Sequence, residues 1–185
     1  MKSESQKTIG IIGAGQMGSG IAQICAQSGF TVILSDISNE ILVTAVNIVR
    51  KRLERLVERK ELSKNKIKII LGNITITQEL KSLSVCDFVL EAATENEKIK
   101  LDIFHNLQPH LSKNTILLTN TSSISITRLA ANTDRPEKFM GLHFMTPVHV
   151  MKLVEMIRVP VVVGVSTSIA VELKLRAAPS GGHMH

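Results

Sequence analysis

Gly13-Ala14-Gly15-Gln16-Met17-Gly18 lies between an apolar run and a helical pattern. The apolar run, residues 9–12, predicts a short buried strand, and residues 20–26 predict a helix rich in small side chains. A second apolar run, residues 31–35, predicts another strand and ends at Asp36. The order of strand, glycine turn, helix, strand and acid is the dinucleotide-binding fingerprint of α/β proteins.

Each glycine of this turn has a physical role. Gly13 permits the tight turn out of the strand, Gly15 has no Cβ and lets a pyrophosphate approach the backbone, and Gly18 lets the helix pack closely on the sheet. The helix N-terminus presents free N–H groups and a partial positive charge to the phosphates. Asp36 can accept hydrogen bonds from both ribose hydroxyls and would repel a 2′-phosphate, so we expect NAD rather than NADP. The alternative is a glycine turn with a solvent-facing Asp36.

The composition suits one aliphatic α/β domain with an anionic ligand. Of the 185 residues, 44% are hydrophobic and only 3% aromatic, with no Trp or Tyr. This favours Val, Ile and Leu strands covered by helices over a β-sandwich. The net charge of +6 is compatible with nucleic acid, a membrane surface or an anionic metabolite as the partner. With few aromatic side chains for stacking and no recognisable DNA-binding motif, we expect a phosphate-rich cofactor and no nucleic acid.

The two cysteines, Cys25 and Cys86, lie in apolar segments and are interpreted as buried thiols in a reducing compartment. Residues 1–7 have no apolar signal core, and no run approaches the roughly 18 apolar residues of a membrane span. We therefore expect a cytoplasmic protein without a membrane segment; an organelle protein with its presequence removed is the alternative. His183 and His185 would chelate a metal only weakly, so no metal site is expected.

Strands and helices alternate along the rest of the chain, which predicts a doubly wound parallel sheet. Polar residues end several of the strands, at the edge where such sheets bind ligands: Asp36, Glu91, Asn120 and Ser122. The expected strands are residues 73–76, 87–91, 115–119, 139–144 and 152–157, and the expected helices run from about residue 38 to 60 and from 95 to 111, with a short helix after Ser123.

The helix expected at residues 38–60 has a basic face, diluted by Glu54 and Glu58. This face is either an ordinary solvated surface or a docking surface for an anionic group of a substrate. Its basic residues are Arg50, Lys51, Arg52, Arg55, Arg59 and Lys60.

Further motifs occur in a fixed order after the glycine turn. The motifs are Gly13–Ala22, Glu91-Ala92-Ala93-Thr94-Glu95-Asn96, Asn120-Thr121-Ser122-Ser123, Gly141-Leu142-His143-Phe144 and Pro147-Val148 followed by Met151-Lys152-Leu153-Val154-Glu155. With these motifs the chain resembles the 3-hydroxyacyl-CoA dehydrogenase family, including its 3-hydroxybutyryl-CoA members, over roughly residues 7–158. The resemblance implies a Rossmann-type domain over residues 1–158. It also implies oxidation of an L-3-hydroxyacyl-CoA to the 3-ketoacyl-CoA, with NAD taking the hydride, in fatty acid or butanoate metabolism.

The resemblance also implies the roles of individual residues. His143 stands where the family has its catalytic base, Glu155 where it has the acid partner of that histidine, and Ser122 where a serine contacts the reacting hydroxyl and the nicotinamide. Thr146 stands where the family commonly has Asn near the nicotinamide. The implied cofactor-binding residues are Gly13, Ala14, Gly15, Gln16, Met17, Gly18, Asp36, Glu95, Lys100, Ser122 and Thr146.

Oxidation of an alcohol needs a base for the hydroxyl proton and a carboxylate beside that base. A neutral imidazole can accept the hydroxyl proton near neutral pH, and a nearby carboxylate stabilises the imidazolium and fixes the ring tautomer. The structural alternatives are a packed His143, an outward-facing Glu155 on a strand, and a Ser122 that caps the following helix.

The last part of the chain departs from the family. The family's helical second domain closes the substrate cleft, supplies most of the homodimer interface and contributes a catalytic asparagine, and nothing in this chain matches it. Residues 159–163 resemble the family's next strand, but the crossover helix that should precede it is absent. We therefore expect residues 159–185 to form an atypical tail, with a strand or short helix at 166–175 and a disordered end at 177–185.

These departures predict that the family's helical second domain is missing, that the chain is truncated, and that acyl-CoA turnover is impaired. One alternative is an NAD-binding module or partner-binding remnant without turnover. The other is a different hydroxyacid dehydrogenase, such as a 6-phosphogluconate or hydroxyisobutyrate dehydrogenase. Those enzymes use a lysine base in their helical domain and lack the arrangement of His143 and Glu155.

Overall fold

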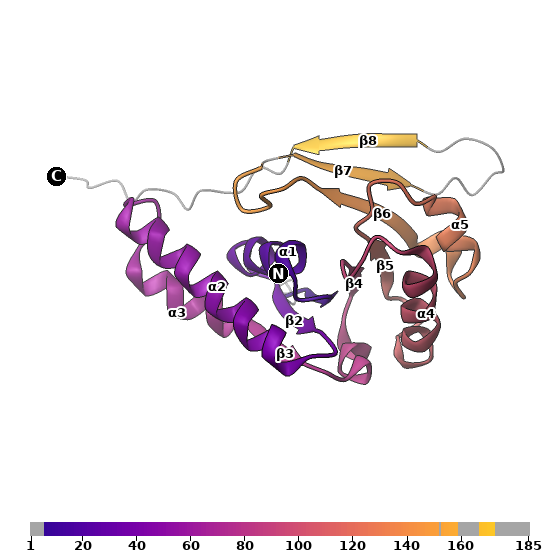
Figure 1. Ribbon diagram of the computed structural model, residues 1–185, viewed down its shortest axis with the longest axis horizontal. Coiled ribbons are helices and arrows are strands. Elements are labelled where there is room, and N and C mark those ends of the chain that lie inside the picture. Colours follow the sequence, from indigo (N-terminus) through magenta and orange to yellow (C-terminus); the bar gives the residue numbers. More distant parts are fainter. Residues whose placement is uncertain (1–5, 152, 159–166, 173–185) are drawn as a thin grey trace, which may run out of the picture.

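The computed structural model describes residues 6–151, 153–158 and 167–172. Within them one eight-stranded sheet has the strand order β3-β2-β1-β4-β5-β6-β7-β8 (Figure 1). The strands are β1 (Thr8–Ile12), β2 (Thr31–Ser35), β3 (Ile74–Thr77), β4 (Phe88–Glu91), β5 (Ile116–Thr119), β6 (Phe139–Phe144), β7 (Leu153–Arg158) and β8 (Thr167–Glu172). The order reverses beside β1, as it does in doubly wound folds.

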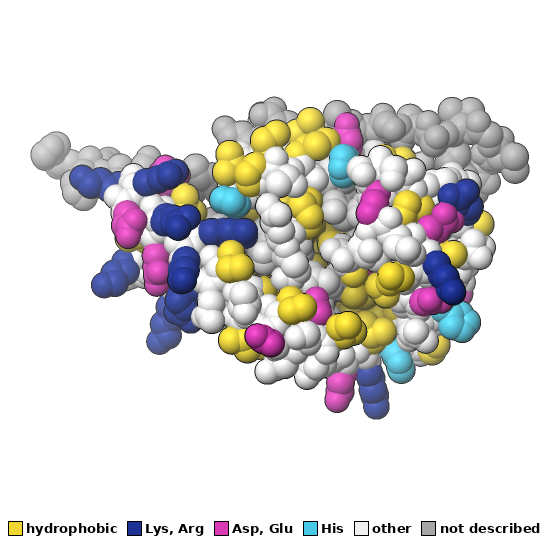
Figure 2. All heavy atoms as spheres, in the orientation of Figure 1, with side chains coloured by type: hydrophobic (Ala, Val, Ile, Leu, Met, Phe, Trp, Pro, Cys, Tyr) yellow, Lys and Arg dark blue, Asp and Glu magenta, His cyan; other side chains and the backbone are white. Residues whose placement is uncertain are grey.

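Five α-helices lie within the described residues, and two of the longer ones begin at a capping side chain. Ser38 accepts the N–H of Ile41 at 3.3 Å, and Asn96 accepts the N–H of Ile99 at 3.1 Å. The helices are α1 (Gln16–Gln27), α2 (Asn39–Glu58), α3 (Lys64–Gly72), α4 (Glu97–Leu107) and α5 (Ile126–Ala131), with 3₁₀ turns η1 (Leu80–Val85), η2 (Gln108–His110) and η3 (Pro136–Lys138). Lys and Arg side chains gather over α2 and α3, at the left of the molecule in Figure 2. No helix of the described ranges is both long and apolar enough to cross a membrane.

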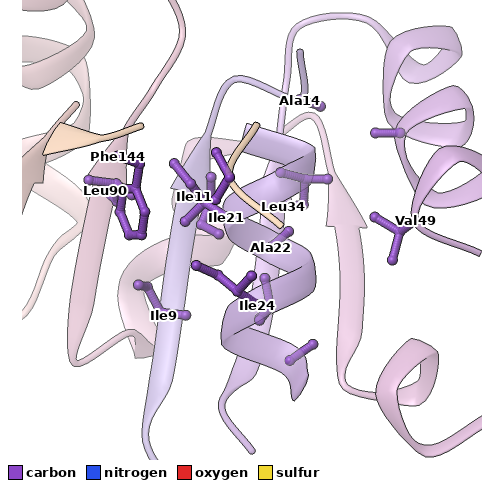
Figure 3. Close-up of a cluster of buried hydrophobic side chains, with 14 of the residues drawn as sticks. Ile9, Ile11, Ala14, Ile21, Ala22, Ile24, Leu34, Val49, Leu90 and Phe144 are labelled. Carbon is purple, nitrogen blue, oxygen red and sulfur yellow. The ribbon is translucent and has the colours of Figure 1, made fainter. Parts of the chain in front are cut away.

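The sheet has a core on each face, because successive side chains of a strand point to opposite sides. Leu90 of β4 belongs to the core under α1, α2 and α3, whereas its neighbour Val89 belongs to the core under α4, α5 and η1. Figure 3 shows the first core, where Ile21 and Ile24 of α1 point toward β1. Both faces are covered, as a largely parallel sheet requires.

The expected Rossmann-type, mostly parallel sheet is confirmed, with one difference at its end. β1 to β6 pair in parallel, but β6–β7 and β7–β8 are antiparallel. The antiparallel direction of β7 follows from its connection, because only residues 145–152 link it to β6, which is too short for a parallel crossover.

Three further differences concern helices and the C-terminal residues. The helix α3 was not expected from the sequence, and the helix expected at residues 95–111 ends as α4 at Leu107. Within residues 166–175, expected as a strand or short helix, the structure has the strand β8. The strand resemblance at residues 159–163 and the expected disorder at 177–185 lie outside the described residues.

Candidate functional site

The glycine turn after β1 is held by the protein's own packing at two of its three glycines. Gly13 has a φ of +96° and donates its N–H to the Ser35 carbonyl at 2.8 Å. A Cβ at Gly13 would lie 2.5 Å from the Cα of Ala93, and a Cβ at Gly18 would lie 1.7 Å from the Gly13 carbonyl oxygen. No side chain fits at either position, so these two glycines are required by the fold itself.

Gly15 differs from the other two glycines. Its φ of −67° is one that any residue adopts, and a Cβ there would meet no protein atom within 4 Å. Gly15 is also the N-cap residue of α1, whose first turn has neither a side-chain cap nor an acidic residue. Nothing among the residues that the structure describes requires glycine at this position. The missing side chain instead leaves open space in front of a positively polarised helix end, where an anionic ligand fits.

A groove of about 330 Å³ lies between this turn and α2. Its wall includes Arg52, whose Nη1 is buried and has no hydrogen-bond partner among the described residues. Burial lowers the pKa of the Arg52 guanidinium. The pKa of His149 is also lowered, mainly because the ring is partly buried and in addition because of the positive charge of Arg52. Since buried polar groups are almost always paired, an unpaired guanidinium nitrogen here fits an anionic ligand group. The groove is lined by Ala14, Gly15, Gln16, Ser19, Glu40, Ile41, Thr44, Ala45, Ile48 and Arg52.

Asp36 follows β2 and is attached to the glycine turn. Its Oδ2 accepts the N–H of Ala14 at 2.8 Å, and its Oδ1 accepts the N–H of Ser38 at 3.2 Å. Each carboxylate oxygen can accept more than one hydrogen bond. The half-buried carboxylate therefore keeps acceptor capacity for ligand hydroxyls beside the turn.

Glu95 lies at the centre of a hydrogen-bond cluster with the loop after β5. Its Oε1 accepts the hydroxyls of Thr121, Ser122 and Ser123 at 2.6, 3.1 and 3.0 Å. The backbone N–H groups of Ser122 and Ser123 donate to the same oxygen. Burial raises the pKa of the Glu95 carboxyl, but these hydrogen bonds outweigh it and lower the pKa to about 2. The carboxylate is thus ionised at neutral pH and holds the Ser122 loop in place.

A fully buried ion pair lies behind this loop. The Lys100 ammonium is 2.5 Å from Glu91 Oε2, and both side chains are completely inaccessible to solvent. Thr119 donates its hydroxyl to the same oxygen at 2.8 Å, and Lys100 also donates to the Asn120 carbonyl at 3.2 Å. Lys100, which the resemblance assigns to the cofactor, therefore contacts the site through Asn120 in this structure.

His143 and Glu155 form a pair across β6 and β7. They are direct partners in the antiparallel register, and His143 Nδ1 lies 2.9 Å from Glu155 Oε2. The side chains are 22% and 41% exposed, so both can be reached from solvent. An ionised carboxylate only accepts hydrogen bonds, so Nδ1 carries the proton and Nε2 of the neutral ring is left as a proton acceptor.

The structure brings most of the expected residues to one edge of the sheet. Ser122 follows β5 and His143 lies on the neighbouring β6, and Asn120 Oδ1 accepts the Phe144 N–H at 2.9 Å. Thr146, in the loop after β6, donates its hydroxyl to the Met17 sulfur of the glycine turn at 3.1 Å.

Sequence reasoning missed part of the site. Thr121 and Ser123 were not assigned as donors to Glu95, although a run of hydroxyl residues directly after a strand was a usable signal. The linking role of Asn120 had no local signal, because Phe144 is far away in the sequence. In the described part of the chain, no three His, Cys, Asp or Glu side chains gather as a metal site would require.

Comparisons with known proteins identify the family of this chain. The family model for the NAD binding domain of 3-hydroxyacyl-CoA dehydrogenase matches residues 8–173. It continues past residue 158, where the sequence placed a domain boundary; that boundary stays a prediction. The 3-hydroxybutyryl-CoA dehydrogenase of Bradyrhizobium diazoefficiens is 47% identical over 152 residues, which are 82% of this chain and 52% of that protein.

Two other proteins extend the comparison. The fatty acid oxidation complex subunit alpha of Acinetobacter baylyi is 43% identical over 80% of this chain and 21% of that protein. The crystal structure of (S)-3-hydroxybutyryl-CoA dehydrogenase from Ralstonia eutropha has a TM-score of 0.81 and 44% identity, and it covers 83% of this chain and 54% of that one. The chain thus spans about half the length of the Bradyrhizobium diazoefficiens and Ralstonia eutropha dehydrogenases.

Proposed function

Since the chain belongs to the 3-hydroxyacyl-CoA dehydrogenase family, we propose that its site oxidises the 3-hydroxyl group of an L-3-hydroxyacyl-CoA to a ketone with NAD. The observation that carries the proposal is the pair of His143 and Glu155, because it leaves Nε2 of a solvent-accessible imidazole free to take a proton. The roles of the individual residues are part of the proposal.

The residues around the glycine turn fit NAD. The open space at Gly15 suits the pyrophosphate, which would receive the free N–H groups of α1. Asp36 suits the adenosine ribose, because its carboxylate accepts from hydroxyls and repels the 2′-phosphate of NADP. When bound, NAD takes up the hydride that leaves C3 of the substrate.

His143 would act as the general base. Its Nε2 accepts the hydroxyl proton as the hydride departs, and Glu155 stabilises the imidazolium that forms. Ser122 would turn its hydroxyl from Glu95 to the substrate oxygen when substrate binds, while the backbone N–H groups of Ser122 and Ser123 keep the loop bonded to Glu95. The alcohol thus loses its hydroxyl proton to His143 and its C3 hydride to NAD, which leaves the ketone.

The α2 side of the groove, at Arg52, would receive a phosphate of the substrate's coenzyme A portion, while the opposite side at Gly15 receives the NAD pyrophosphate. The unpaired Nη1 of Arg52 lines this groove, and Arg55 and Arg59 follow it at helical spacing on the exposed, basic side of α2. Figure 2 shows the basic side chains that gather over this part of the molecule. Guanidinium groups bind phosphates through charge-assisted hydrogen bonds, which matches the phosphates of coenzyme A.

Two measurements test the proposal. Calorimetry with NADH measures cofactor binding, and the loss of NADH absorbance with acetoacetyl-CoA measures turnover in the reductive direction. We expect NADH to bind, and turnover to be weak compared with the longer Ralstonia eutropha relative. We expect His143→Gln to lower turnover by roughly 10²–10⁴-fold without changing NADH affinity.

Glu155→Gln should lower turnover as well, because the imidazolium loses its partner. A matched control is His105→Gln, an exposed histidine of α4 outside the site. Turnover that is unchanged in His143→Gln would overturn the assignment of the base. NADH binding with no turnover in the unaltered chain would favour the alternative, an NAD-binding module without catalytic activity.

A further inference from the structure

We infer that Asn120 is a positioning residue that fixes the end of β6, and with it His143, against the loop that carries Ser122. The inference rests on the roles proposed above for His143 and Ser122. It starts from the place where the strand pairing between β5 and β6 ends.

The parallel ladder of β5 and β6 stops before the catalytic end of β6. Its last register pair is Thr119 with Gly141, and His143 and Phe144 lie beyond it. On the other side β7 continues to pair as far as Phe144, which is opposite Val154. The end of β6 is therefore supported by strand pairing on one side only.

Asn120 supplies the missing support. Its side-chain Oδ1 accepts the Phe144 N–H at 2.9 Å, so a side chain continues the pairing that the β5 backbone no longer provides. The bond holds the residue directly after His143, and Asn120 itself is only two residues before Ser122. One amide side chain thus joins the end of β6, which carries His143, to the loop that carries Ser122.

The backbone of Asn120 is in turn held at both of its polar groups. Its N–H donates to the Glu91 carbonyl at 2.7 Å, and its carbonyl accepts from Lys100 Nζ at 3.2 Å. The Lys100 and Glu91 side chains are fully buried, so this anchor has no freedom to move into solvent. Lys100 therefore influences the site by fixing Asn120, without a direct path to a ligand.

An uncharged acceptor suits this position. Aspartate would also accept the Phe144 N–H, but it would add a charge to an edge that already holds Glu91, Glu95 and Glu155. Leucine has a similar size and no acceptor. Small errors in the position of catalytic groups cost large factors in rate, so a fixed spacing between His143 and Ser122 has a direct catalytic value.

The test compares Asn120→Leu with Asn120→Asp in the full chain by NMR. We expect the Phe144 amide to exchange with solvent at least tenfold faster in Asn120→Leu, relative to the amides of β1. We also expect the ring ¹⁵N resonances of His143 to shift. Asn120→Asp should restore the slow Phe144 exchange, because the acceptor is retained.

Thr115→Val is the control for a merely structural effect. It removes a buried hydrogen bond to the Cys86 carbonyl at the other end of β5 and leaves the bond between Asn120 and Phe144 in place. The inference is overturned if Asn120→Leu leaves the Phe144 exchange or the His143 resonances unchanged, or if Thr115→Val produces the same changes. Neither readout needs turnover, so an unaltered chain without activity would count against the proposed function alone.

Discussion

The carboxylate of Asp36 accepts the backbone N–H of Ala14 at 2.8 Å. This hydrogen bond joins the acid at the end of β2 to the glycine turn at the end of β1. The group proposed to bind the ribose and the turn proposed to bind the phosphates are thereby held together before any ligand arrives, which would lower the ordering cost of binding.

Asp36→Ala should weaken NADH binding by about 10- to 100-fold, because it removes a charged acceptor for the ribose hydroxyls. It should also narrow the preference for NADH over NADPH, since the 2′-phosphate is no longer repelled. Calorimetry with both cofactors measures the two effects. Asp102→Ala, at an exposed position of α4, makes the same change of charge and should alter neither. An unchanged NADH affinity in Asp36→Ala would exclude this account of the ribose site.

Gly15 and Gly18 should respond to alanine in opposite ways. At Gly15 the added methyl meets no protein atom, so Gly15→Ala should keep its melting temperature and lose NADH affinity. At Gly18 the methyl would collide with the Gly13 carbonyl, so Gly18→Ala should lose about 3 kcal/mol or more of stability. Gly72→Ala, at the end of α3 with nothing within 4 Å, is the neutral control. Full NADH affinity in Gly15→Ala would show that its open space is not a phosphate site.

Local patterns were sufficient for the glycine turn and the elements beside it. The glycine turn, the strand before it and Asp36 follow from the sequence alone, because each part lies within a few residues of the next. Helical spacing likewise located α2 and α4 to within a few residues. These features depend on contacts between residues that are close together in the sequence.

Features that depend on contacts between residues far apart in the sequence could not be predicted from local patterns. The direction of β7 is set by the length of the loop after β6 and by pairing with a neighbour, and the apolar pattern of a strand does not encode direction. The burial of Lys100 was also unexpected. A lysine on a helix normally faces solvent, and only the approach of Glu91 and Asn120 from two strands makes its burial favourable.

Arg52→Gln should weaken the binding of coenzyme A without affecting NADH. The guanidinium lines the groove with an unpaired Nη1, and its loss removes a charge-assisted bond to phosphate. We expect about a tenfold loss of affinity at low salt, which shrinks as the ionic strength rises. Lys51→Gln, at the neighbouring exposed position of α2, makes the same change of charge outside the groove. Equal losses in both variants would indicate a diffuse basic surface rather than a site at Arg52.

Lys100→Met should destabilise the protein by about 3–5 kcal/mol, because it leaves the buried Glu91 carboxylate without its cation. The double variant Lys100→Met with Glu91→Gln removes the unpaired charge and should recover most of this loss. Urea unfolding of the two single variants and the double variant measures the coupling between the residues. Simple additivity of the two single changes would contradict a direct ion pair.

The pH dependence of stability should reveal the Glu95 cluster. The hydrogen bonds from Thr121, Ser122 and Ser123 lower the pKa of Glu95 from 4.5 to about 2. A lowered carboxyl pKa contributes stability that is fully present above the unfolded value of 4.5 and is lost as the pH falls toward 2. Glu95→Gln should therefore melt below the unaltered protein at pH 7, and the difference should shrink between pH 4.5 and pH 2.

The control for this prediction is Glu79→Gln, at an exposed carboxylate outside the cluster. Its melting temperature should follow that of the unaltered protein across the same pH range. Because Glu95 is itself largely exposed, solvent screening keeps the difference small, and thermal melts must be compared at low ionic strength. A difference that stays constant from pH 7 to pH 2 would mean that the Oε1 hydrogen bonds do not depend on the charge of Glu95. The Ser122 loop would then be held by hydrogen bonds that are equally strong to the charged and to the neutral Glu95 side chain.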